Sequence, residues 1–134
     1  MQISVPAETI PNERRVALIP DTTKKLVRVG FEVVVQSGLG EQAGFSDDTY
    51  SEAGATVSDD RAALLADGDI VLRVRKPDAS EVNQLKHGAI HVSYLDPYNE
   101  RDLVDTMAKQ GVSAISMEMI PRTTRAQKMD ALSS

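Results

Sequence analysis

The sequence predicts an α/β fold in which an open parallel sheet carries helices on both of its faces. Short apolar segments alternate with segments of helical pattern along the 134 residues, at a spacing typical of βαβ units. Several apolar segments are nearly continuous, as expected for strands that are covered on both faces. Glycines that can end a helix precede strand-like or extended segments, at Gly30, Gly54, Gly68, Gly88 and Gly111.

Five strands and five helices are expected from these patterns. The strands are residues 3–5, 31–36, 70–74, 89–95 and 112–117. The helices are residues 22–29, 47–53, 59–66, 79–86 and 100–110. Each helix follows a residue whose side chain can accept a hydrogen bond from the first turn, namely Asp21, Ser46, Ser58, Asp78 and Asn99. Glu81 stands three residues after Asp78, which is the spacing of a capping box.

Composition narrows the class of protein. Hydrophobic residues make up 41% and charged residues 26%, and no apolar run approaches the roughly 20 residues that span a bilayer. No secretory signal is visible, so a cytoplasmic location is expected. A net charge of −5, with 15 basic residues spread among 20 acids, argues against a nucleic-acid partner. The lack of cysteine excludes disulfides and zinc–thiolate sites, and no metal site is expected.

Ligands of open parallel sheets bind at the carboxyl ends of the strands, so function is expected on the loops that follow them. These loops are residues 9–15, 37–44, 75–78, 96–99 and 119–127. The second loop contains Gly38-Leu39-Gly40-Glu41-Gln42-Ala43, which superficially fits the phosphate-binding pattern G-x-G-x-x-A. The helix that should receive the phosphate begins only near Ser46, so we interpret this segment as a plain glycine-rich loop.

Charged groups on the other loops have ordinary explanations. Arg14 and Arg15 could grip a carboxylate or phosphate, but an ion pair with Glu13 or Asp21 is the favoured interpretation. His87 is expected in the last turn of a helix. His91 is expected to be packed within a strand, and neither histidine is expected to be catalytic.

The last fourteen residues, 121–134, concentrate two guanidiniums, an amide, a carboxylate and several hydroxyls. Thr124 and Gln127 could simply form a capping box. A regular helix would bring Gln127 and Asp130 to one face but would turn Ser133 away, so a shared role requires a non-helical part. Because the segment is followed by no helix-ending residue, we expect the natural protein to continue and residues 1–134 to be its first domain.

The pattern Pro121-Arg122-x-x-Arg125-Ala126-Gln127-x-Met129-Asp130-x-Leu132-Ser133-Ser134 resembles the signature of proton-translocating nicotinamide nucleotide transhydrogenases, in their NAD(H)-binding α component. Similarity continues upstream through residues 12–20, 30–33, 37–40 and 53–55, and so covers essentially the whole chain. The resemblance implies a Rossmann-like or flavodoxin-like fold and direct hydride transfer from NADH to NADP⁺, coupled to proton translocation. It also implies that a second domain, absent from this chain, holds most of the NAD(H), so the isolated chain is expected to be inactive.

The same resemblance assigns roles within the last segment. Arg122, Asp130 and Ser133 are expected to bind the nicotinamide carboxamide and to fix the ring, and Gln127 is expected to reach toward a partner that carries NADP(H). Gln127 and Asp130 are the candidate catalytic residues. The implied partners are an NADP(H)-binding component, membrane-spanning subunits and a second copy of the chain, with the complex peripheral to the cytoplasmic side of the inner membrane.

Alanine dehydrogenases share this amino-terminal architecture and provide the main alternative. Their substrate-binding arginine matches Arg15, but their lysine falls at Arg75 and their general-acid histidine falls at Asp96. Reduction of an imine or ketone needs a proton donor, whereas hydride transfer between two nicotinamide rings needs none. The missing histidine therefore favours the transhydrogenases. A non-catalytic interaction module that keeps the fold is a third possibility.

Overall fold

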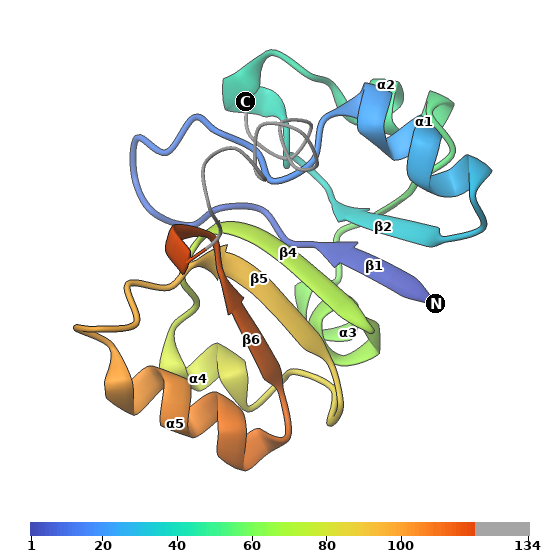
Figure 1. The fold of residues 1–134 in the computed structure, drawn as a ribbon. Coiled ribbons are helices and arrows are strands. Elements are labelled where there is room, and N and C mark those ends of the chain that lie inside the picture. Colours follow the sequence, from blue (N-terminus) through green and yellow to red (C-terminus); the bar gives the residue numbers. More distant parts are fainter. Residues whose placement is uncertain (120–134) are drawn as a thin grey trace.

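The computed structural model describes residues 1–119 and contains one six-stranded parallel sheet (Figure 1). The strands are β1 (Gln2–Val5), β2 (Glu32–Gln36), β3 (Thr56–Ser58), β4 (Ile70–Arg75), β5 (Ile90–Tyr94) and β6 (Ser113–Ser116). Every neighbouring pair of strands runs parallel. The predicted α/β fold with an open parallel sheet is confirmed.

The strand order is β3-β2-β1-β4-β5-β6, so the chain winds outward from β1 in one direction and then returns to build the other half from β4. This is the order of Rossmann-type sheets and differs from the flavodoxin type. The winding direction reverses between β1 and β4, where the loops leaving the two strands diverge. The topology therefore places a binding crevice at the carboxyl ends of β1 and β4.

Helices lie on both faces of the sheet (Figure 1). They are α1 (Pro20–Arg28), α2 (Asp47–Glu52), α3 (Arg61–Asp67), α4 (Ala79–Val82) and α5 (Arg101–Gln110), with short 3₁₀ turns η1 (Glu41–Ala43) and η2 (Met117–Met119). Alternate strand residues supply two separate cores, since Leu72 packs in the first and its neighbour Val71 in the second. Among the described residues no helix is both long and apolar enough to cross a bilayer.

The strand β3 was not predicted from the sequence. It has only three residues, pairs with β2 alone and lies at an edge of the sheet. Such a strand contains no apolar run that periodicity could detect. Its presence also makes the predicted cap at Ser58 wrong, because Ser58 belongs to the strand. The side chain of Asp60 caps α3 by accepting a hydrogen bond from the Ala63 amide at 3.1 Å.

The other predicted caps have mixed outcomes. Ser46 caps α2 as predicted, with its hydroxyl accepting a hydrogen bond from the Thr49 amide at 3.4 Å. The cap at Asp21 is wrong, because α1 begins one residue earlier at Pro20, whose fixed φ suits the first helical position. The cap at Asn99 is also wrong, because its side-chain amide donates to Asp96 and α5 begins at Arg101.

The capping box of Asp78 and Glu81 does not form. The helix α4 ends at Val82 rather than near residue 86, and the Asp78 side chain makes no capping hydrogen bond. Glu81 instead accepts hydrogen bonds from Arg61 Nε and from Arg73 Nη1, each at 2.9 Å. The ion pairs of Glu81 with these two arginines, which are distant in sequence, therefore replace the capping hydrogen bond that the local sequence predicts.

Candidate functional site

The loop after β1 carries Glu13, which binds two arginines at the carboxyl edge of the sheet. Glu13 accepts hydrogen bonds from Arg15 Nε at 3.0 Å and Nη2 at 2.9 Å, and from Arg75 Nε at 2.7 Å. The predicted ion pair between Arg15 and Glu13 is confirmed. One buried carboxylate, 4% exposed, thus holds two half-exposed guanidiniums close together above β4.

Glu8 fastens the same loop to the neighbouring strand. Its two carboxylate oxygens accept hydrogen bonds from the backbone amides of Val74 and Arg75, each at 2.9 Å. This contact occurs where the pairing of β4 with β5 becomes irregular, between Leu72 and Arg75. Glu8 therefore satisfies amides at the end of β4 and fixes the direction in which Arg75 leaves the strand.

The pocket beside this ion pair lies between the loops that follow β1 and β2, next to the crevice expected between β1 and β4. A pocket of about 100 Å³ is lined mainly by polar residues of the loops after β1 and β2, including Glu8, Glu13 and Arg15. The guanidinium of Arg15 also lies over the Tyr94 ring, 5.7 Å from its centroid, at the end of β5. A guanidinium has five N–H donors, and Glu13 binds only one nitrogen of Arg75 and two of Arg15. The arrangement can therefore bind an additional anionic group.

The bond to two arginines predicts a specific acid dependence of stability. Hydrogen bonds from Arg15, and then from Arg75, lower the pKa of Glu13 from 4.5 to about 2 against the opposing effect of burial. Because the folded pKa is below the unfolded one, this stabilisation is complete above pH 4.5 and is lost as the pH falls toward 2. Urea unfolding at several pH values should show wild type more stable than Glu13→Gln at pH 6, with the difference shrinking below pH 4.5. A difference independent of pH would contradict this assignment.

Asp96 follows β5 at the same edge and occupies a left-handed conformation, with φ of 53°. Its carboxylate oxygens accept hydrogen bonds from Asn99 Nδ2 at 3.0 and 3.2 Å, and its amide donates to Glu118 Oε2 at 2.9 Å. The two hydrogen bonds from Asn99 fix the Asp96 carboxylate in place, and in both of them it is the acceptor. The position therefore has the chemistry of an anchored carboxylate and not that of an imidazole acid.

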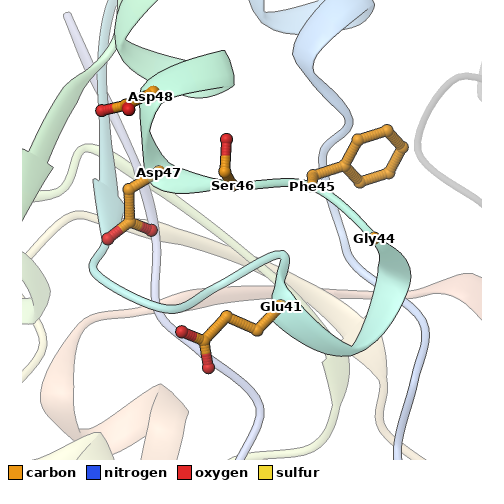
Figure 2. A pocket seen from close by; sticks show the side chains of 6 residues that line it. All are labelled: Glu41, Gly44, Phe45, Ser46, Asp47 and Asp48. Carbon is orange, nitrogen blue, oxygen red and sulfur yellow. The ribbon is translucent and has the colours of Figure 1, made fainter.

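The glycine-rich loop does not form a phosphate site. The loop continues into the 3₁₀ turn η1, and Asp47 accepts hydrogen bonds from Ser37 Oγ at 2.9 Å and from the Gly38 amide at 2.8 Å. Figure 2 shows the adjacent pocket of about 450 Å³, in which the carboxylates of Glu41, Asp47 and Asp48 are the charged groups and Phe45 points away from them. This acidic lining would repel a pyrophosphate, which supports our interpretation of the segment as a plain loop.

Packing explains why Gly40 is a glycine. A Cβ at this position would lie 2.7 Å from both Cβ and the carbonyl oxygen of Phe45, and 2.9 Å from the Tyr50 ring. We expect Gly40→Ala to lower the free energy of unfolding by about 2–3 kcal/mol, the upper part of the overpacking range, because a backbone atom and a buried ring must move. Gly30→Ala is the control, since it has positive φ but no atom within 4 Å and should cost only about 1 kcal/mol. Chemical denaturation of both variants tests this prediction, and equal losses would contradict it.

The two histidines lie outside the site. His91 is completely buried within β5, as predicted. His87 is not in a helix, because α4 ends five residues earlier; its Nδ1 lies 3.0 Å from the carbonyl oxygen of Gln110.

The candidate residues for nicotinamide binding, Arg122, Gln127, Asp130 and Ser133, lie outside the described residues 1–119. The described chain reaches the carboxyl edge of the sheet at η2, immediately after β6. Sequence reasoning missed Glu8 and Tyr94 as parts of the site. The only available signal was that Glu8 lies on the loop after the first strand, and one acid on such a loop is not distinctive.

Comparison with known proteins provides independent evidence of relationship. The family model for the alanine dehydrogenase/PNT N-terminal domain matches residues 4–134. NAD(P) transhydrogenase subunit alpha of Cereibacter sphaeroides is 40% identical over 100% of this chain and 26% of its own length. The subunit of the same name from Haemophilus influenzae is 36% identical over 100% of this chain and 26% of its own length. Alanine dehydrogenase of Halomonas elongata is 39% identical over 90% of this chain and 32% of its own length.

Solved structures give the same result. The transhydrogenase from Sinorhizobium meliloti superimposes with a TM-score of 0.88 at 38% identity, over 97% of this chain and 39% of that one. An L-alanine dehydrogenase gives a TM-score of 0.81 at 30% identity, over 87% of this chain and 32% of that one. The chain thus spans about a quarter to two fifths of the relatives that it matches. Sequence and fold together establish that the chain belongs to the alanine dehydrogenase/PNT N-terminal domain family, with the resemblance to transhydrogenases confirmed.

Proposed function

We propose that this chain is the first domain of the NAD(H)-binding component of a proton-translocating transhydrogenase. The complete enzyme would transfer hydride directly from NADH to NADP⁺ and couple the transfer to proton movement across a membrane. The observation that carries the proposal is Asp96, an anchored hydrogen-bond acceptor where a ketone- or imine-reducing relative has its general acid. Hydride transfer between two nicotinamide rings adds no proton to carbon, so it needs alignment of the rings and no acid at this position.

The proposal distributes the cofactors between domains and partners. A second domain, following this one in the polypeptide, would hold most of the NAD(H), and a separate component would carry NADP(H). The acidic pocket beside the glycine-rich loop supports this division, because its carboxylates would repel a phosphate and Asp47 already accepts the hydrogen bond of the Gly38 amide. The assembly would contain membrane-spanning subunits and two copies of this component, and would lie on the cytoplasmic side of the membrane.

Residues of the last segment would align the nicotinamide ring in this scheme. Arg122, Asp130 and Ser133 would bind the carboxamide, whose carbonyl needs a donor and whose amino group needs an acceptor. Gln127 would face the NADP(H)-bearing component. The end of the described chain supports this assignment, since η2 follows β6 at the carboxyl edge of the sheet and the segment comes next in the sequence.

The test is hydride transfer from NADH to an NADP⁺ analogue by the full-length polypeptide mixed with an NADP(H)-binding component. We expect transfer without added amine or keto acid. The 134-residue chain alone should bind NADH only weakly, so a submillimolar dissociation constant by direct titration would contradict the proposed division of cofactor binding.

An amino-acid dehydrogenase of the alanine type is the second candidate. Its supporting observation is the half-exposed guanidinium of Arg15, which has N–H donors that Glu13 does not use and could bind a substrate carboxylate. Ammonia-dependent oxidation of NADH with pyruvate by the full-length polypeptide, without transfer to NADP⁺, would replace the first proposal with this one.

A further inference from the structure

Three buried polar side chains lie on the neighbouring strands β4 and β5, on the side of the sheet that carries the second core. They are Arg73 on β4 and His91 and Ser93 on β5, and they are 4%, 0% and 0% exposed. His91 and Ser93 share one face of β5 because they are two residues apart, and His91 pairs with Val71 of the second core. We call these three residues the polar layer.

The polar layer contains buried atoms whose hydrogen-bonding capacity is unused within residues 1–119. These atoms are Nδ1 and Nε2 of His91, Oγ of Ser93 and Nε of Arg73. Buried polar atoms almost always have a partner, and four unpartnered ones in one layer would be strongly destabilising. The concentration of these atoms on two neighbouring strands points to a ligand that several of them share.

The chemistry of the unused atoms identifies the kind of ligand. Burial and the charge of Arg73 lower the pKa of His91 to about 3, so its ring is neutral near pH 7, with one N–H donor and one acceptor nitrogen. Arg73 Nε can only donate, while the Ser93 hydroxyl can do both. An anion would leave the acceptor nitrogen of His91 empty, whereas water both donates and accepts.

We propose that the polar layer is a binding site for ordered internal water, held by His91, Ser93 and Arg73. The water extends a network that already links four segments of the chain. Arg73 Nη1 donates to Glu81, Arg61 Nε donates to the same carboxylate, and Arg61 Nη1 donates to the Ala7 carbonyl at 2.8 Å. Ala7 precedes Glu8, so water at Arg73 Nε would help to orient a network that ends at the loop of the candidate site.

The first test compares Ser93→Ala with Ser4→Ala in the 134-residue chain. Both serines are fully buried in the sheet, and the Ser4 hydroxyl donates directly to the Leu64 carbonyl at 2.7 Å. If Ser93 binds water, its loss should lower the melting temperature by several degrees, about as much as the loss of Ser4. If Ser93 has no partner, alanine removes an unsatisfied group and the melting temperature should stay constant or rise, which would overturn the proposal.

The second test needs no substitution. Rotating-frame cross-peaks between water and the His91 ring protons, together with ¹⁵N shifts of a single neutral tautomer, are expected from NMR of the wild-type chain. Their absence would overturn the proposal. Replacing gluconate by chloride at constant ionic strength should leave the melting temperature unchanged, and a rise of several degrees would instead identify a bound anion.

Discussion

Replacing Glu81 by alanine should lower the free energy of unfolding by about 3–5 kcal/mol, because two guanidiniums lose the carboxylate that neutralises them. Arg73 is the more demanding partner, since its side chain is 1% exposed and cannot turn into solvent. Arg61 is less buried, at 22%, and keeps hydrogen bonds to the Ala7 carbonyl and to Gln36 Oε1. The loss should therefore come mainly from the buried charge of Arg73.

Two further substitutions make this prediction specific. Glu81→Gln keeps a hydrogen-bond acceptor but no charge, so its loss should be intermediate between wild type and Glu81→Ala. Asp78→Ala is the matched control, because Asp78 is an exposed acid at the start of the same helix and makes no capping bond. It should change the free energy of unfolding by no more than about 0.5 kcal/mol. Urea denaturation measures all three, and a loss below about 1 kcal/mol for Glu81→Ala would show that Arg73 is neutralised by other means.

The fold could be predicted because the same sequence pattern, an apolar strand segment followed by a helix, recurs along the chain. Five of the six strands have apolar segments that are detectable without knowledge of their neighbours, and alternation with helices indicates a parallel sheet. The exception, β3, is three residues long and is defined by its pairing with β2. Caps were less predictable, because Glu81 and Asn99 carry capping side chains that distant or local partners use instead.

The candidate site likewise has a part that the sequence predicts and a part that only the structure reveals. The pair of Arg15 and Glu13 spans two residues, so local sequence sufficed to predict it. The bond from Arg75 to Glu13 spans 62 residues and depends on β4 lying beside β1. Periodicity does not reveal strand order, so the convergence of Glu8, Glu13 and Arg75 required the structure.

Asn substitutions at Asp130 and Gln127 should each reduce hydride transfer between NADH and an NADP⁺ analogue by about 100-fold in the full-length enzyme, if the proposed alignment of the nicotinamide rings holds. Asp130→Asn keeps the size of the side chain but removes the charge, so it should weaken the grip on the carboxamide amino group. Gln127→Asn keeps the amide but shortens its reach by one methylene. Steady-state and single-turnover rates at saturating nucleotide measure the effect on the transfer step.

Affinity separates alignment from simple loss of binding. Because a second domain is proposed to hold most of the NAD(H), both variants should bind NADH within a few-fold of wild type while the transfer rate falls. Lys128→Ala is the matched control, since it lies between the two residues in sequence, has no assigned role and should transfer hydride at the wild-type rate. Wild-type rates in both Asn variants would remove Gln127 and Asp130 from the site, whereas an equal loss of rate and affinity would make them binding residues with no separate effect on ring geometry.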